Sequence, residues 1–118
     1  MIPLNPVDVE NRIRDITERI SKGVAICDAR YREYLRADHA YELAFAAAYL
    51  DATGRPAHER KYAAEVATAE QRAARDVADA AYQYVNRTAR ALENELRAWQ
   101  SVGASVRAMY SVAGVGER

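Results

Sequence analysis

One apolar stripe at helical spacing constrains this chain more than any other feature. Its members recur every three or four residues across positions 62–109 without a proline, as they would on one side of an α-helix. They are Tyr62, Val66, Ala69, Ala73, Val77, Ala81, Tyr84, Thr88, Leu92, Leu96, Trp99, Val106 and Met109. A helix of about fifty residues is roughly 75 Å long. A chain of 118 residues cannot cover such a surface alone. The sequence therefore indicates assembly with other chains more clearly than it indicates a catalysed reaction.

The composition favours helix throughout. Alanine, arginine, glutamate and leucine are common, and the chain has three prolines, all in or beside expected loops. Runs that alternate polar and apolar residues are too short to form a convincing strand. We therefore expect an all-α protein with a single domain over residues 1–118.

Turn and cap residues give the expected helix boundaries. Asn5 followed by Pro6 is typical of a helix start, and Gly54 followed by Pro56 is typical of a stop and a new start. The short connection predicts a long antiparallel helical hairpin. The expected segments are helix one over about 6–52, a turn over 53–56, helix two over about 57–113 and a mobile tail over 114–118.

Two positions leave the number of helices open between two and four. Gly23 could bend or break helix one, and Thr68 followed by Glu70 and Gln71 could start a new helix. The apolar face expected for helix one comprises Val9, Ile13, Ile16, Ile20, Val24, Cys27, Tyr31, Leu35, Tyr41, Phe45 and Tyr49.

The steps along the long stripe are irregular, which predicts nearly straight packed helices more than a long supercoiled dimer. We expect helix one to cover the stripe up to about Tyr84 and to leave the part from Thr88 onwards for other subunits. The hairpin would then assemble into a homo-oligomeric helical bundle or ring. The expected interface residues are Leu92, Leu96, Trp99, Val102, Val106 and Met109.

Charge and targeting features indicate a soluble protein of the cytoplasm. The formal net charge is zero, so no overall field attracts nucleic acid or membranes. No secretion signal or membrane-spanning run is expected. The single cysteine, Cys27, fits a reducing compartment and is expected to be a small buried apolar group. If a phage encodes the chain, the compartment is the host cytoplasm.

Catalytic and metal-binding patterns are sparse. The two histidines are His39 and His58, and His39 with Glu42 forms an isolated pair on one helical face. No second such pair, phosphate-binding glycine loop or nucleophile motif accompanies it. We expect no enzyme activity, no metal and no cofactor.

Arginines near aromatic residues are the strongest sign of a ligand. Arg87, Arg90, Arg97 and Arg107 occur near Trp99 and Tyr84, and arginines interleaved with aromatic rings are typical of single-stranded nucleic-acid binding. Repetition around an oligomer would strengthen such contacts. For this group of arginines in a single chain, an ordinary solvated helix surface is the competing interpretation.

The chain also resembles the UvsY-type recombination mediators of tailed phages over roughly residues 35–110. The residues that carry the resemblance are Ala47–Asp51 with Thr53–Arg55, Ala78 with Asp79, Tyr82–Tyr84, Ala91 with Leu92, and Ser101–Met109. The resemblance implies a ring-like homo-oligomer that binds single-stranded DNA. It also implies loading of a recombinase onto strands covered by single-strand-binding protein.

The family's basic DNA contacts precede the Gly-Arg turn, where this chain has Ala47 and Tyr49. Arg55, Arg60 and Lys61 could replace that charge, as could Arg87 and Arg90. The alternative is a small helical adaptor or inhibitor that binds a host or phage protein through an exposed apolar helix face, without nucleic acid.

Overall fold

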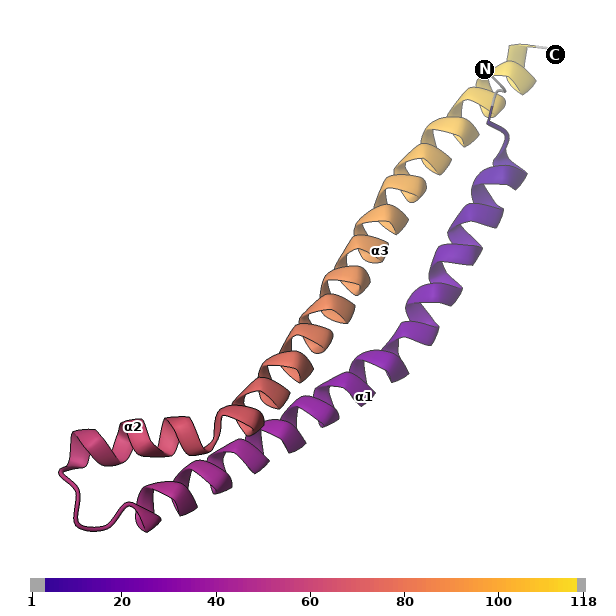
Figure 1. Ribbon diagram of the computed structural model, residues 1–118. Helices are drawn as coiled ribbons and strands as arrows, with labels where there is room; N and C mark the ends of the chain where they lie inside the picture. The colour runs from indigo at the N-terminus through magenta and orange to yellow at the C-terminus, as the bar shows by residue number, and fades with distance from the viewer. Residues whose placement is uncertain (1–3, 117–118) are drawn as a thin grey trace. The chain divides into compact units, whose positions relative to one another are not determined.

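The computed structural model describes residues 4–116, which form three α-helices and no strand within that range (Figure 1). α1 is Pro6–Asp51, α2 is Ala57–Ala67 and α3 is Ala69–Gly116. The all-α helical hairpin expected from the sequence is confirmed. None of these helices is both long and apolar enough to cross a membrane.

Capping and turn residues mark where α1 begins and where the chain turns between α1 and α2. The Asp8 N–H donates to Asn5 Oδ1 at 2.9 Å, which caps the start of α1. α1 then continues through Gly23 without a break. Gly54 has a φ of +90°, a left-handed conformation that costs glycine little. The Arg60 Nε donates to the Arg55 carbonyl oxygen at 2.8 Å and ties α2 to the turn.

Thr68 separates α2 from α3, so the single second helix expected over 57–113 is two helices. The Thr68 side chain is buried, and both its N–H and its hydroxyl donate to the Ala64 carbonyl oxygen, at 3.1 and 2.7 Å. This local bond competes with regular helix geometry. α3 continues as far as Gly116. The last two residues of the expected mobile tail, 117 and 118, lie outside the described residues.

The chain divides into two compact units. The terminal unit comprises the described parts of Met1–Val24 and Arg87–Arg118, and the turn unit comprises Ala25–Asn86. In each unit, a part of α1 packs antiparallel to a part of α3. In the turn unit, α2 also lies beside the end of α1 (Figure 1). Ala48 of α1 and Ala63 of α2 line a common surface depression there.

The contact faces of both long helices follow a strict heptad pattern, with steps that alternate between four and three residues. Every position in the two series is buried or half-buried. In α1 they are Val9, Ile13, Ile16, Ile20, Gly23, Cys27, Arg30, Tyr34, Ala37, Tyr41, Ala44 and Ala48. In α3 they are Gln71, Arg75, Ala78, Tyr82, Val85, Ala89, Leu92, Leu96, Trp99, Gly103 and Val106. This is the spacing of a coiled-coil seam, contrary to the irregular packing that we expected.

The prediction that helix one covers the first part of the long apolar stripe, up to about Tyr84, is therefore wrong. Tyr62, Val66, Val77 and Tyr84 are 63–79% exposed and do not face α1. Each step of four residues rotates a position by about 40° around a helix, and the stripe takes several such steps in succession. It thus winds from the solvent side of α3 onto the seam near Leu92. On α1 the prediction that Val24 and Leu35 lie on the contact face is wrong, because both are exposed.

The terminal unit has the best-packed part of the seam. Val9, Ile16, Leu92 and Val106 are all buried there. A Cβ atom on Gly103 would lie 3.1 Å from Val9 Cγ1, so the missing side chain allows the two helices to approach closely.

The turn unit packs mainly through aromatic and polar side chains. The Tyr31 and Tyr34 rings lie 5.0 and 6.5 Å from the Tyr82 ring, between centroids. The Arg75 guanidinium lies 4.5 Å from the centre of the Tyr41 ring and 3.9 Å from Asp38 Oδ1. Ala64 is the one buried hydrophobic residue described in this unit.

Two isoleucines in α1 test where the core lies. Replacing buried Ile16 by alanine should lower the free energy of unfolding by about 3 kcal/mol, because transfer and cavity terms add. Ile26→Ala, at a position 51% exposed, should cost less than about 1 kcal/mol. Urea unfolding followed by circular dichroism measures both, and equal losses would contradict the seam described here.

Candidate nucleic-acid interface

The five basic residues predicted to bind DNA lie in two different units. Arg55, Arg60 and Lys61 belong to the turn unit, and Arg87 and Arg90 belong to the terminal unit. The structure therefore gives two separate candidate surfaces, which are described in turn.

The first surface is an arginine stripe on α3, defined by Arg87, Arg90 and Arg97. All three side chains are exposed, and with Asn94 they follow steps of three, four and three residues, which places them on one side of the helix. The seam residues Leu92 and Leu96 lie on the opposite side. The Arg97 Nη1 donates to Asn94 Oδ1 at 3.4 Å. This stripe is a row of guanidinium groups pointing away from α1.

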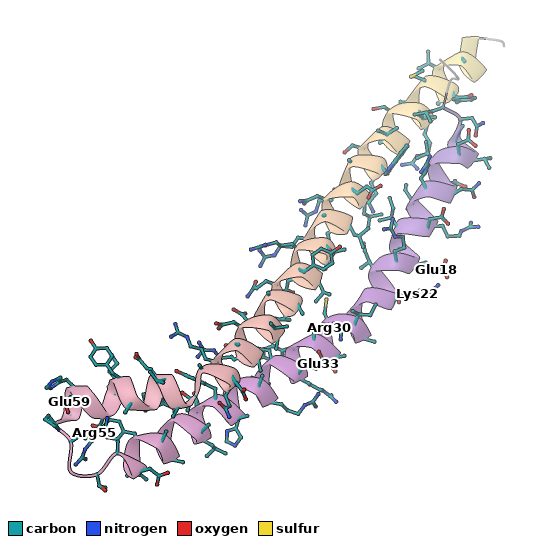
Figure 2. The ribbon with its side chains drawn as sticks, viewed as in Figure 1. Glu18, Lys22, Arg30, Glu33, Arg55 and Glu59 are labelled. Carbon is teal, nitrogen blue, oxygen red and sulfur yellow. The ribbon has the colours of Figure 1, made fainter. Side chains whose placement is uncertain are left out.

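Within residues 4–116, no carboxylate forms an ion pair with any member of the arginine stripe. Several cations of α1 are paired instead, as Figure 2 shows for Lys22 with Glu18 at 3.1 Å and for Arg30 with Glu33 at 3.0 Å. The Lys22–Glu18 pair is largely exposed and the Arg30–Glu33 pair is partly exposed, and such pairs add little stability. The arginine stripe differs from them because its charge is not neutralised by a neighbour.

The charge of the surroundings also favours the arginine stripe. The described part of the terminal unit has eight Lys and Arg residues against six Asp and Glu residues. The turn unit has eight against ten. An approaching phosphate is therefore attracted more strongly to the terminal unit.

The second surface, around the turn, is less suited to phosphate. Arg55 and Lys61 are exposed, but Arg60 is half-buried and its Nε already donates to the turn. Glu59 lines the same shallow depression as Arg55 on α2 (Figure 2). A carboxylate beside these cations weakens their attraction for DNA.

The aromatic partners expected for the arginines are not on the stripe. Trp99 occupies a seam position and is half-buried, and the Arg12 guanidinium lies 5.7 Å from the centre of its ring. Tyr84 belongs to the turn unit. Arg107 is also off the stripe, because its Nη1 lies 3.7 Å from where a Gly103 Cβ would be. The sequence interpretation missed the heptad register. This register places Trp99 on the seam and Arg87, Arg90 and Arg97 together on the solvent side of α3.

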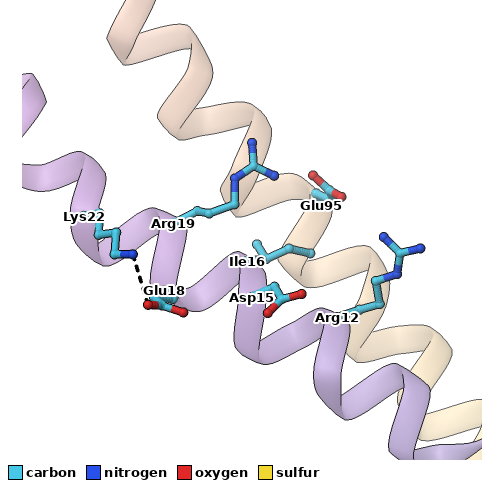
Figure 3. A pocket seen from close by; sticks show the side chains of 7 residues that line it. All are labelled: Arg12, Asp15, Ile16, Glu18, Arg19, Lys22 and Glu95. Atoms are coloured by element: carbon cyan, nitrogen blue, oxygen red, sulfur yellow. Dashed lines mark ion pairs between the residues drawn. The ribbon is translucent and has the colours of Figure 1, made fainter.

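A pocket of about 280 Å³ in the terminal unit has no net preference for a charged ligand (Figure 3). Three cations and three carboxylates surround Ile16 in it. They are Arg12, Arg19, Lys22, Asp15, Glu18 and Glu95. Two of the six neutralise each other in the Lys22–Glu18 ion pair. The pocket is thus a solvated depression over a core residue.

The residues considered for catalysis lie apart from one another. His39 and His58 are exposed, and no group of three or more His, Cys, Asp or Glu side chains gathers within the described residues. Cys27 is half-buried on the seam, with its Sγ 3.7 Å from the Val85 carbonyl oxygen.

The residues predicted to form the subunit interface mostly contact the chain itself. Leu92 and Val106 are buried, and Leu96, Trp99 and Val102 are half-buried, while Met109 is 66% exposed. Packing against α1 accounts for the buried and half-buried members without a second chain. An interface at these six positions stays a prediction, and Met109 is its most accessible member.

No protein-family model, curated protein or solved structure matches this chain. A function for this chain therefore has to be inferred from the geometry above.

Replacing Trp99 by alanine distinguishes packing within the chain from packing between subunits. Because Trp99 lies on the seam, we expect the variant to lose about 2 kcal/mol of unfolding free energy and to keep the mass of the parent protein. Val112→Ala, at a position 73% exposed and outside the predicted interface, is the control and should change neither the stability nor the mass measurably. Light scattering measures the mass, and a lower mass at unchanged stability would place Trp99 between subunits.

Proposed function

We propose that this chain is a non-enzymatic protein of the recombination-mediator type, which binds single-stranded DNA as a homo-oligomer in the cytoplasm. In this role it would help a recombinase to load onto strands covered by single-strand-binding protein. The arginine stripe carries the proposal, because its three exposed guanidinium groups lie on one face of α3 and are unpaired with any carboxylate of residues 4–116.

The spacing of the arginine stripe suits a phosphate backbone. Arg87 and Arg97 are ten residues apart, or about 15 Å along a helix, a span that several nucleotides of an extended strand can match. Guanidinium groups bind phosphate oxygens through paired hydrogen bonds. Three contacts per subunit would be weak in a monomer, and several subunits on one strand would multiply them.

A zero net charge is compatible with this function because the charge is unevenly distributed. The excess of cations in the terminal unit is balanced by the excess of carboxylates in the turn unit. DNA contacts would therefore be confined to the terminal unit, and binding would be strongly dependent on salt.

The adaptor hypothesis stays the second candidate, and the exposed apolar side chains of the turn unit favour it. Val66 is 79% exposed and Val77 70% exposed, and large exposed apolar groups commonly mark protein contacts. An adaptor would capture one protein in stoichiometric amount after nuclease treatment, and it would not bind oligonucleotides.

Fluorescence anisotropy with a labelled single-stranded oligonucleotide tests the DNA hypothesis. The variant Arg87→Ala/Arg90→Ala/Arg97→Ala should bind at least about 30-fold more weakly at low salt, with a shallower salt dependence, because each lost phosphate contact lowers the slope by about 0.7. Micromolar parent protein that fails to bind would refute the proposal.

The control for this experiment is the variant Arg14→Ala/Arg36→Ala/Arg72→Ala. It removes the same charge from three exposed arginines away from the stripe, and it should bind nearly as the parent does. Equal losses in both triple variants would indicate nonspecific attraction instead of a site. A larger loss in Arg55→Ala/Lys61→Ala would move the site to the turn.

A further inference from the structure

The aromatic residues of the terminal unit lie away from the arginine stripe. In the part of this unit that the structure describes, they are Trp99 and Tyr110. Trp99 is half-buried on the seam, and the Arg12 guanidinium lies 5.7 Å from the centre of its ring. Tyr110 follows Gly103 by seven residues and so continues the register of the seam. Neither ring is on the side of α3 that carries the arginine stripe.

Tyr84 is the aromatic residue that precedes the arginine stripe in the sequence, and it belongs to the turn unit. It comes six residues before Arg90 and 13 residues before Arg97. At 3.6 residues per turn, both spacings put Tyr84 more than about 100° around the helix from those two arginines. A base stacked on Tyr84 would therefore lie off the line of the arginine stripe.

The arginine stripe lies on a convex helix surface. In its described part, the terminal unit consists of portions of α1 and α3, and α1 packs against the seam on the opposite side of α3. No other helix of this unit rises beside the stripe to form a groove. Proteins that bind single strands commonly combine a basic groove with aromatic rings that stack on the bases. The arginine stripe has the charge of such a site without its groove or its rings.

The polar groups of the arginine stripe are mainly hydrogen-bond donors. Each guanidinium has five N–H donors and no acceptor. Asn94 lies between Arg90 and Arg97, and its Oδ1 already accepts from Arg97 Nη1 at 3.4 Å. Phosphate oxygens accept hydrogen bonds, and every DNA strand presents them whether or not its bases are paired. The contacts that the stripe can make are therefore common to single-stranded and duplex DNA.

We propose that the arginine stripe binds the phosphate backbone without regard to base pairing, so that duplex DNA is a second ligand of the same surface. This inference rests on the DNA binding proposed above and adds to it a ligand class. Duplex DNA carries one negative charge per about 1.7 Å of its axis, a higher density than that of a single strand. Because no base stacking favours the single strand, charge density decides, and the duplex should bind at least as tightly.

Fluorescence anisotropy of the full chain tests the inference with a labelled mixed-sequence oligonucleotide and with its blunt-ended duplex. At about 50 mM salt, the dissociation constant for the duplex should be equal to or lower than that for the single strand. The logarithmic salt dependence should be about 1.3-fold steeper for the duplex, because each phosphate contact contributes about 0.9 in duplex and about 0.7 in single-stranded DNA. Arg87→Ala/Arg90→Ala/Arg97→Ala should weaken binding of both forms at least about 30-fold.

The outcomes separate this inference from the proposed function. A single strand that binds more tightly than the duplex would overturn the inference and leave the proposed function intact. Duplex binding that survives in the triple variant would also overturn it, because the duplex would then occupy another surface. If neither form of DNA binds, the proposed function fails together with the inference.

Ser101 is a position at which the missing ring can be added. It is exposed and follows Arg97 by four residues, which places it on the same side of α3. Ser101→Trp should tighten single-strand binding at least about five-fold through base stacking and leave duplex binding unchanged. The control Val7→Trp adds the same ring at a position 63% exposed on α1 and should change neither affinity. An equal gain in both tryptophan variants, or no gain in Ser101→Trp, would contradict the role given to stacking and overturn the inference.

Discussion

The heptad spacing of the α1 and α3 contact faces is the constraint on which the rest of the structure depends. It decides that Leu92, Leu96 and Trp99 lie inward, and so it decides that Arg87, Arg90 and Arg97 lie outward. It likewise leaves Val77 on α3 exposed to solvent. The candidate DNA surface is thus a consequence of the packing register.

The two units use that register with different side chains. The terminal unit fills it with branched aliphatic residues and a close-approach glycine, and it buries four of them. The turn unit fills it with tyrosines, alanines and Arg75, which stay largely half-buried. The apolar core is therefore larger in the terminal unit, which also contains the arginine stripe.

The sequence was sufficient to predict the helices, the turn around Gly54 and the contact face of the first part of α1. Val9, Ile13, Ile16 and Ile20 are large and apolar among polar neighbours, so their pattern has one interpretation. The α3 face was mispredicted before Leu92 because alanine occurs on every side of that segment, and alanine gives no direction. Arg97 was omitted from the predicted site although its spacing from Arg87 and Arg90 places it on the same side of the helix. The burial of Leu92 and Leu96 on the opposite side shows that this side faces solvent.

The contacts of Arg75 favour one alignment of α3 along α1. Its guanidinium occupies a seam position and meets both the Tyr41 ring and the Asp38 carboxylate. If α3 slid by one heptad along α1, the position of Asp38 would be taken by Tyr31 or Phe45, neither of which can neutralise a cation. Arg75 would keep its ion pair with Asp76 on α3 in any alignment, but it would lose the second carboxylate, so the Asp38 contact favours the observed alignment over others that alanine-rich helices could adopt.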